Sequence, residues 1–438
     1  MQTRFSTAQL ADPDNRDSEK ELRRCVHCGF CTATCPTYVL LGDELDSPRG
    51  RIYLIKDLLE NERAPDAAVV VHIDRCLSCL ACVTTCPSGV NYQRLIDHAR
   101  SYIERNYRRP WRERWLRATL AHVLPYPRRL AAALRMAQLT RVVLLPLARA
   151  TGLRSLSAML ELLPSTSRGA PRRRELSAAP AGKDAMRVAV LKGCAEPVIR
   201  PQIRAATLRL LARMGVTVAE VPGESCCGAL VHHLGRADQA RAQARINVDR
   251  WSSELESRGL AAIVATASGC GTMLKDYAHV LANEPRYAER AARLAACSYD
   301  VSELIAARGL PPLVRRPALR VAYQAPCSLQ HGQALRVSPR QLLTDAGFEV
   351  LEPDEAHLCC GSAGTYNLLQ PQLAAALRTR KIEKLEALAP DVIASGNIGC
   401  ITQLQVATAV PIVHTVELLD WATGGPAPSQ LPAQRRPS

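Results

Sequence analysis

The sequence predicts an α + α/β chain: a helical, cysteine-rich N-terminal domain followed by two repeated α/β domains. Two cysteine runs of identical spacing lie within the first 106 residues, separated by stretches with helical periodicity. From Met186 onward, short apolar segments typical of strands alternate with helical ones. The same series, with its cysteines, starts again at Leu319, which indicates an internal duplication.

Both N-terminal cysteine runs, residues 25–36 and 76–87, follow the bacterial iron–sulfur pattern C-x₂-C-x₂-C-x₃-C-P. Three closely spaced thiolates can cover three corners of a 4Fe–4S cube, and in paired runs the fourth cysteine ligates the other cluster. The spacing therefore predicts two 4Fe–4S clusters with crossed ligation. The predicted ligands are Cys25, Cys28, Cys31 and Cys86 for one cluster, and Cys76, Cys79, Cys82 and Cys35 for the other.

Zinc is the alternative occupant of these runs, but structural zinc sites use ligands in separated pairs, whereas each run places four cysteines within eleven residues. The chain has 17 cysteines and opens without a basic start followed by an apolar stretch, so we expect no secretory signal. Cysteines in a reducing, cytoplasmic compartment are expected to bind metal and not to form disulfides.

The elements of the first 106 residues follow the cysteine runs. The polar residues 1–20 are expected to be loose. Ile52, Ile55 and Leu59 give the segment 52–61 an apolar face at helical spacing, and a second helix is expected from Gln93 to about Asn106. These features predict a helical ferredoxin-like domain over residues 1–106.

Residues 107–185 form a basic connector. Between Arg100 and Glu175 there are 17 arginines and four glutamates but no lysine or aspartate, which accounts for most of the net charge of +15. The pattern predicts short amphipathic helices broken by Pro125, Pro127 and Pro146. Two interpretations of this segment stay open: it contacts anionic lipid or an acidic partner, or it is a solvated linker. Residues 165–182, rich in Ser, Pro, Ala and Arg, are expected to form a flexible boundary.

Bulk composition excludes two classes of function. We expect no membrane span, because no run of about 18 apolar residues is present. The aromatic content of 4% argues against base-stacking surfaces, so no nucleic-acid partner is expected.

The α/β part divides into residues 186–312 and 313–438. Expected strands in the first copy begin at Met186, Val216 and Ala261, with a helix over 198–214 between the first two; those of the second copy begin at Leu319, Phe348 and Asp391. Each copy has a cysteine after its first strand, a Cys-Cys-Gly triplet after 31 intervening residues, and a further cysteine after its third strand. These cysteines are Cys194, Cys226, Cys227 and Cys270, and Cys327, Cys359, Cys360 and Cys400.

Each set of four cysteines is a candidate metal site, because the carboxyl ends of parallel strands converge at one edge of a sheet. The alternative is a set of free cysteines that fill the core, which the duplicated spacing disfavours. Cys297 has no counterpart in the second copy and is interpreted as a core residue. His232, His233, His331, His357 and His414 lie near these sites and are interpreted as structural histidines.

The Cys-Cys-Gly triplets resemble the cysteine-rich CCG domains of heterodisulfide reductases and related respiratory subunits. The whole arrangement resembles the iron–sulfur subunit of glycolate oxidase, and the local matches are residues 25–38, Gly42–Asp46, Pro48–Lys56, Thr266–Gly271 and His357–Tyr366. The resemblance implies an electron-transfer subunit with two 4Fe–4S clusters. It also implies FAD-containing partner subunits that oxidise glycolate to glyoxylate, transfer of the electrons to membrane quinone, and a peripheral location on the inner face of the cytoplasmic membrane.

The chain departs from the heterodisulfide reductase pattern at the end of each copy, where Cys270 and Cys400 stand alone and no terminal C-x-x-C occurs. Each copy thus offers four thiols, which puts a five-thiolate cluster in doubt but leaves a metal or an ordinary cluster open. A related lactate or anaerobic glycerol-3-phosphate dehydrogenase subunit is one alternative. A disulfide-reducing enzyme is another, disfavoured by the missing C-x-x-C. Because no G-x-G-x-x-G motif occurs, we expect no substrate chemistry from this chain alone.

Overall fold

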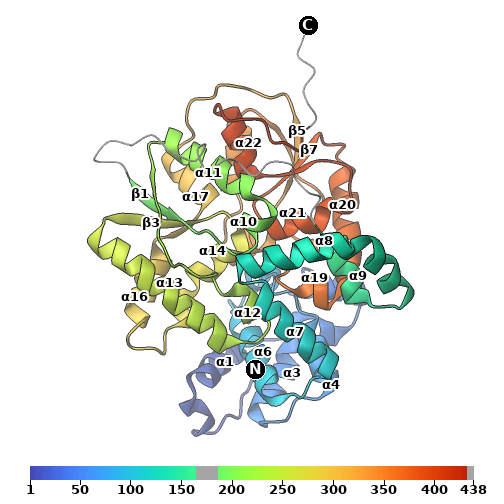
Figure 1. Ribbon diagram of the computed structural model, residues 1–438. Helices are drawn as coiled ribbons and strands as arrows, with labels where there is room; N and C mark the ends of the chain where they lie inside the picture. Colours follow the sequence, from blue (N-terminus) through green and yellow to red (C-terminus); the bar gives the residue numbers. More distant parts are fainter. Residues whose placement is uncertain (164–185, 432–438) are drawn as a thin grey trace.

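The computed structural model describes residues 1–163 and 186–431. The N-terminal helices lie together at one end of the molecule, and the two sheets lie beyond them, one formed by each copy of the duplicated unit (Figure 1). This is the predicted α + α/β architecture. The expected flexible boundary at 165–182 lies outside the described residues.

The N-terminal part is helical. Its helices are α1 (Pro13–Arg24), α2 (Pro36–Leu41), α3 (Pro48–Glu60), α4 (Ala67–Asp74), α5 (Ala81–Thr85) and α6 (Tyr92–Asn106). They enclose a core that includes Leu22, Ile55 and Leu95, each without exposed surface. Helix α3 begins four residues before the predicted helix, because the Ser47 side chain accepts a hydrogen bond from the Gly50 amide and caps it.

The first twenty residues are ordered, so the expectation of a loose segment was wrong. Helix α1 starts within them, capped by the Asp12 carboxylate, which accepts from the Asp14 amide at 2.9 Å. The amino group of Met1 donates to the carbonyl oxygen of Cys25 at 2.6 Å, which fixes the chain start against the first cysteine run. A contact made by the terminal amine leaves no periodic pattern in the sequence, so it could not have been predicted.

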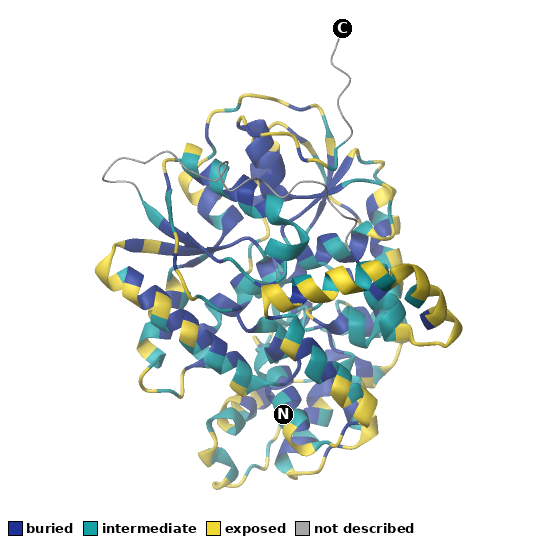
Figure 2. Ribbon diagram, in the orientation of Figure 1, coloured by how far each residue is buried: buried dark blue, intermediate teal, exposed yellow. Residues whose placement is uncertain are grey.

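The connector contains α7 (Trp111–Val123), α8 (Pro127–Ala150) and α9 (Arg154–Glu161). The predicted break at Pro146 is wrong, because α8 continues through it. The amide missing at Pro146 would have bonded the carbonyl of Val142, a residue 84% exposed, so water can satisfy that carbonyl. Figure 2 shows α8 largely exposed along its length.

Helix α8 was not singled out from the sequence, yet among the described residues it is a candidate membrane span by length and composition. It is 24 residues long and contains an 18-residue stretch of mean hydropathy 1.4, so length and composition alone would allow a span. Only 6% of that stretch is buried, unlike the core helix of a globular domain. The prediction missed it because two arginines interrupt the apolar residues.

Each α/β copy contains one four-stranded parallel sheet. The first has the order β2-β1-β3-β4 and the second β6-β5-β7-β8. The strands are β1 (Arg187–Val190), β2 (Thr217–Ala219), β3 (Leu260–Ala265), β4 (Ser298–Asp300), β5 (Arg320–Gln324), β6 (Glu349–Leu351), β7 (Val392–Ser395) and β8 (Ile412–His414). The order matches between copies, and β4 and β8 are additional to the predicted strands.

Helices surround both sheets. Those of the first copy are α10 (Glu196–Ile199), α11 (Pro201–Arg213), α12 (Ala229–His233), α13 (Ala237–Ser257), α14 (Ser268–Lys275), α15 (Tyr277–Val280), α16 (Ala288–Ala296) and α17 (Val301–Arg308). Those of the second are α18 (Ser338–Asp345), α19 (Tyr366–Leu369), α20 (Pro371–Glu386), α21 (Ile398–Gln405) and α22 (Thr415–Ala422). The single helix predicted over 198–214 is instead α10 and α11, because Pro201 starts a new helix.

The two copies pack on each other through equivalent helices: α11 contacts α22, and α17 contacts α18. One apolar core joins both sheets and includes Val188 from β1 and Val321 from β5. The Asp420 carboxylate, 1% exposed, accepts hydrogen bonds from Arg209 and Arg213 across this interface. The two α/β copies therefore behave as one packed body.

Candidate metal centres

The two N-terminal cysteine runs have the same backbone form. In each run a residue with positive φ precedes the second cysteine and another follows it: His27 and Gly29 in the first run, Ser78 and Leu80 in the second. A bulky residue such as Leu80 rarely adopts this conformation. The loops are thus shaped to turn three thiols toward one point, as ligands of one cluster require.

The fourth cysteine of each run lies near the other run. Cys25, Cys28, Cys31 and Cys86 all line one small cavity, and Cys82 of the second run lines it as well. Burial raises the pKa of the Cys25 thiol, and the neighbouring thiol of Cys86 raises it further. Burial likewise raises the pKa of Cys82, with the thiols of Cys79, Cys76, Cys35 and Cys31 adding to it.

This donor set fits 4Fe–4S groups, because the eight thiols of the two runs lie close together and their spacing is that of cluster-binding runs; the crossed division into two sets of four stays a prediction. Pro36 begins α2 immediately after Cys35. Cys86 ends α5 in extended conformation, so the chain turns away from the thiols after each fourth cysteine.

Arg51 lies between the two runs and was not anticipated. Its guanidinium, 1% exposed, donates to the backbone carbonyl of His72 at 2.7 Å and to the Asp46 carboxylate at 3.2 Å, and its Nη1 lies 3.8 Å from the Cys35 sulfur. Burial opposes its charge, but the thiols of Cys76 and Cys35 raise the pKa of Arg51 overall. Arg51 thus supplies a buried positive charge beside thiols that bind metal as thiolates.

The four cysteines of the first α/β copy meet at the carboxyl edge of its sheet. Cys194 follows β1, Cys226 and Cys227 follow β2, and Cys270 lies on α14 after β3. Their thiols form a continuous hydrogen-bonded series in that order. The thiols of Cys194 and Cys227 lower the pKa of Cys226 because they hydrogen-bond its thiolate form.

The second copy repeats this geometry. The thiols of Cys327, Cys359, Cys360 and Cys400 form the same series, and Cys400 lies on α21 after β7. All four are buried. The side-chain amide of Asn397 lies 3.5 Å from the Cys400 sulfur. Both strand orders change direction between the first and third strands, the position where parallel sheets bind ligands.

Lys381, on α20, adds a buried positive charge to the second site. It is 3% exposed, and its Nζ donates to the Glu355 carbonyl at 2.7 Å. Burial lowers the pKa of Lys381, although the thiols of Cys327, Cys360 and Cys359 oppose this. A single lysine in an amphipathic helix gives no sequence signal that it is buried, so sequence reasoning missed it.

The repeats can be aligned through their glycines to find the position equivalent to Lys381. A Cβ atom on Gly361 would lie 2.5 Å from the carbonyl oxygen of Ala374, and one on Gly228 would lie 3.3 Å from that of Ala240. Lys381 and Asn247 each follow the contacted alanine by seven residues. The first site therefore has a neutral amide where the second has a cation.

The second N-terminal run lies against the second α/β site. Burial raises the pKa of Cys79, and the neighbouring thiol of Cys327 is the next cause. Leu77, Cys327 and Cys359 belong to one apolar cluster, against which Cys79 packs. The cysteines of two separate sequence regions are thus neighbours.

A hydrogen bond fixes this contact. The Thr84 hydroxyl and the His331 Nδ1 are 2.7 Å apart, and these residues follow Cys82 and Cys327 closely in sequence. Burial lowers the pKa of His331 to about 4, so this histidine is neutral and structural, as interpreted from the sequence.

Other predicted structural residues also have structural contacts. The His414 ring bonds the Thr266 carbonyl at 2.9 Å across the two copies, and His232 lies 3.1 Å from the Asp97 carboxylate. Cys297 donates to the Leu294 carbonyl at 3.3 Å and packs against the core of the first copy.

Comparison with known families agrees with this geometry. The profile of the 4Fe-4S dicluster domain matches residues 24–90, and that of the cysteine-rich domain (CCG) matches residues 188–275 and 321–405. The first match covers both N-terminal runs, which supports iron–sulfur clusters as the cofactor there. The other two each cover the four cysteines of one α/β copy.

Similar proteins cover nearly the whole chain. The chain is 40% identical over 422 residues to the "Glycolate oxidase iron-sulfur subunit" of Escherichia coli K12, covering 96% of this chain and 99% of that protein. It is 32% identical over 437 residues to the "Probable glycolate oxidase iron-sulfur subunit" of Bacillus subtilis 168, with coverages of 93% and 96%. "Lactate utilization protein A" of Bacillus subtilis 168 is 22% identical over 242 residues, covering 54% of this chain and 99% of that protein. The chain therefore belongs to the family of glycolate oxidase iron–sulfur subunits, proteins that act together with partner subunits.

Proposed function

We propose that this chain transfers electrons within a glycolate-oxidising complex, from FAD-containing subunits to membrane quinone. Cys25, Cys28, Cys31 and Cys86 would hold one 4Fe–4S cluster, and Cys76, Cys79, Cys82 and Cys35 the second. The clusters supply one-electron carriers that a two-electron flavin reaction needs. The printed names of the two relatives that span the whole chain favour glycolate over lactate as the substrate of the complex.

The packing of Cys79 against the apolar cluster that contains Cys327 and Cys359 carries this proposal, together with the hydrogen bond between Thr84 and His331. It places the second N-terminal cysteine run beside the second CCG site. The phenol of Tyr366, 5% exposed, has both Cys76 and Cys359 as electrostatic neighbours and packs in the same cluster. The shared apolar cluster between the two sites favours electron transfer over an independent role for each domain.

The proposed role of each domain follows the segments of the sequence. We propose a two-cluster domain at 1–106, a connector at 107–185, and CCG domains at 186–312 and 313–438. Cys194, Cys226, Cys227 and Cys270 would hold a metal or cluster in the first CCG domain, and Cys327, Cys359, Cys360 and Cys400 in the second. The convergence of four thiols in each site supports this, because thiolates need a bound cation to remain charged together.

We also propose a peripheral position on the inner face of the cytoplasmic membrane. Trp111 and Trp115 are each 67% exposed on α7, and Leu139 is 78% exposed on α8 among arginines. An exposed apolar surface with basic residues is typical of contact with anionic lipid. Binding to anionic vesicles should weaken as salt reduces the Debye length from about 30 Å to about 3 Å. Salt-independent binding, or binding unaffected by Leu139→Glu, would contradict this location.

The function is tested with the complex purified under anaerobic conditions. Glycolate should reduce the iron–sulfur clusters of this chain, as followed by electron paramagnetic resonance, whereas lactate and glycerol 3-phosphate should reduce them more slowly. Cys327→Ser should leave cluster reduction by glycolate intact and slow onward transfer to quinone. The matched change Cys297→Ser, at a cysteine outside both sites, should have no effect. Quinone reduction at the normal rate in Cys327→Ser would overturn the proposed path.

A further inference from the structure

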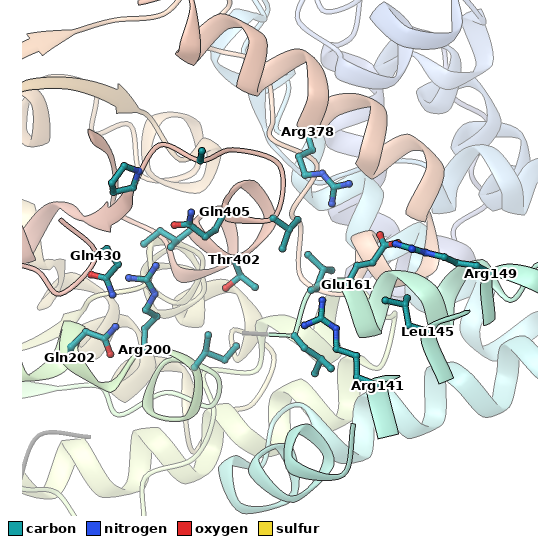
Figure 3. Close-up of a pocket in the computed structure, with 17 residues that line it drawn as sticks. Arg141, Leu145, Arg149, Glu161, Arg200, Gln202, Arg378, Thr402, Gln405 and Gln430 are labelled. Atoms are coloured by element: carbon teal, nitrogen blue, oxygen red, sulfur yellow. The ribbon is translucent and has the colours of Figure 1, made fainter. Parts of the chain in front are cut away.

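A cavity of about 790 Å³ lies where α8 and α9 meet α21 and α10 (Figure 3). Its size is in the range of small-molecule binding sites. Apolar walls come from Leu145, Leu163, Ile199 and Ile401, while arginine, glutamine and threonine side chains supply polar groups. None of the eight CCG cysteines lines it, so it is distinct from the metal centres.

The cavity contains hydrogen-bond donors that lack acceptors. Within the described residues, the buried donors Arg200 Nη1, Arg378 Nε and Gln202 Nε2 have no hydrogen-bond partner, and neither has one buried acceptor of the cavity, Gln430 Oε1. Buried donors are normally satisfied, because leaving one unpaired costs about 1–3 kcal/mol. The donors therefore predict a ligand that contributes oxygen acceptors.

The charge of the cavity is positive. Arg141, Arg149, Arg200 and Arg378 line it together with a single carboxylate, that of Glu161, which accepts from Arg149 at 2.8 Å. Figure 3 shows Arg149 directed at Glu161, and Arg200 beside Gln202 on the other side. Guanidinium groups aimed into a partly buried cavity stabilise oxygens on which negative charge develops.

The position of the cavity links it to the second CCG site. Ile401 and Thr402 line the cavity and directly follow Cys400 on α21. An α-helix with its side chains is about 10–12 Å across, so a ligand here lies roughly one helix width from the Cys400 site. Cys79 of the N-terminal domain packs against the apolar cluster that contains Cys327 and Cys359 of that site, so the second CCG site lies between the N-terminal cysteines and the cavity.

The cavity also borders the exposed apolar helix. Leu145 and Arg141 of α8 line it, while Val142 and Val143 of the same helix are 84% and 69% exposed. A ligand with an acceptor-bearing head and an apolar tail could place its head in the cavity and its tail along α8. This combination selects an amphiphile from the membrane over a small soluble ion.

We propose that this cavity binds the ring of a membrane quinone and is the place where the quinone is reduced; the inference rests on the proposed electron-transfer function. The quinone accepts two electrons, which originate from the hydroxy acid oxidised on the flavin subunits, and two protons from water, so both carbonyls become hydroxyls. Arg200, Gln202 and Arg378 donate hydrogen bonds to the carbonyl oxygens, and these bonds strengthen as the oxygens gain charge.

Binding is the first test and does not depend on turnover. The full chain, with its iron content verified, is titrated with a short-tailed benzoquinone by calorimetry. Arg200→Met and Arg378→Met should each weaken binding about tenfold or more, as expected for a hydrogen bond from a charged donor. Arg135→Met is the matched control, because Arg135 is exposed on α8 and does not line the cavity. Equal quinone affinity in all four proteins would overturn the proposal.

A second arm separates quinone from anionic ligands. Inorganic phosphate and vesicles of anionic phospholipid are titrated with the same variants. Loss of phosphate or vesicle binding with unchanged quinone binding would overturn the proposal in favour of a lipid headgroup site. Weaker quinone binding in the two cavity variants, with phosphate binding unchanged, supports it.

Activity of the whole complex tests the quinone site separately from the proposed electron-transfer function. With glycolate as the donor, the complex that carries Arg378→Met should reduce a soluble dye at the wild-type rate. It should reduce quinone at least about tenfold more slowly than the wild-type complex. Wild-type quinone reduction by the variant would overturn the cavity assignment alone. Failure of the wild-type complex to reduce either acceptor would overturn the proposed function, and the calorimetric result would still decide whether the cavity binds quinone.

Discussion

Lys381 and Asn247 occupy equivalent positions in the two CCG repeats but differ in charge. Both are buried, and each hydrogen-bonds the loop that leads to its cysteine pair: Asn247 Nδ2 donates to the Cys226 carbonyl at 3.1 Å, and Lys381 Nζ to the Glu355 carbonyl at 2.7 Å. At this position the second site therefore has a cation and the first a neutral amide. Duplication has kept the cysteine geometry and changed the electrostatics.

The first prediction concerns this cation. Lys381→Met removes a positive charge that favours thiolates, so the second site should bind its metal or cluster about 10–100-fold more weakly. Affinity is measured by chelator competition on the full chain, with metal content resolved by elemental analysis. Lys384→Met, an exposed lysine on the same helix, serves as the control and should leave affinity unchanged. Unchanged affinity in Lys381→Met would show that the charge has no role in the site.

The second prediction concerns Arg51. Its replacement by methionine removes one donor to the Asp46 carboxylate, 0% exposed, which keeps its partners Arg75 and His72, and should lower the free energy of unfolding of the N-terminal domain by about 1–3 kcal/mol. Denaturant unfolding of the cluster-loaded chain, followed by loss of cluster absorbance, measures this. Arg49→Met breaks a partly exposed ion pair with Glu44, so its effect should stay within about 1 kcal/mol. Similar losses in the two variants would count against a special role for the buried pair.

The third prediction is a pH dependence at Asp300, which caps α17. Burial raises the pKa of Asp300 to about 6, despite hydrogen bonds from Ser302 that favour the charged form. Because the pKa is higher in the folded state, the stabilising effect of the proton is complete below about pH 4 and is lost as the pH rises through 6. Asp300→Asn keeps a capping side chain but cannot ionise.

The stability difference between Asp300→Asn and the wild type should therefore shift by about 1.4 kcal/mol in favour of the variant between pH 5 and pH 7.5. Denaturant unfolding at both pH values, followed by circular dichroism, provides the measurement. A constant difference across this range would mean that Asp300 titrates at its ordinary value in the fold.

The features that could be predicted from the sequence are those that depend on the spacing of cysteines. The cysteine runs and the repeated triplets fix both the candidate ligands and the duplication, because each depends on residue type at a short, exact interval. Strands β4 and β8, each three residues long, were not predicted. Arg51 and Lys381 were missed because a charged residue in an amphipathic helix is ordinarily solvated, and only tertiary packing against thiols determines otherwise.

The contact between Cys79 and Cys327 could not have been predicted for a similar reason. It depends on how the N-terminal helices dock on the α/β body, through contacts such as Arg94 with Asp276 at 2.9 Å. Such long-range ion pairs leave no periodic pattern in the sequence. The cavity beside α21 likewise arises from elements more than 200 residues apart.

The last prediction tests the crossed ligation of the N-terminal domain. If Cys86 belongs with Cys25, as their lining of one cavity indicates, Cys25→Ser and Cys86→Ser should lose the same cluster. Cys35→Ser should instead lose the other one, since the thiol of Cys35 lies near those of Cys76 and Cys82. Uncrossed ligation would pair Cys35 with Cys25 and make these two variants alike.

Electron paramagnetic resonance of the reduced chain distinguishes these outcomes, because two nearby reduced clusters couple magnetically and the loss of either one leaves a single uncoupled signal. The remaining signal should be identical in Cys25→Ser and Cys86→Ser and different in Cys35→Ser, with iron content falling by about half in all three if each cluster holds four irons. Cys297→Ser is the control, since this thiol lies in the first CCG core and donates to a backbone carbonyl. Identical residual signals in Cys25→Ser and Cys35→Ser would reverse the assignment, and full iron content in Cys86→Ser would remove Cys86 from the ligand set.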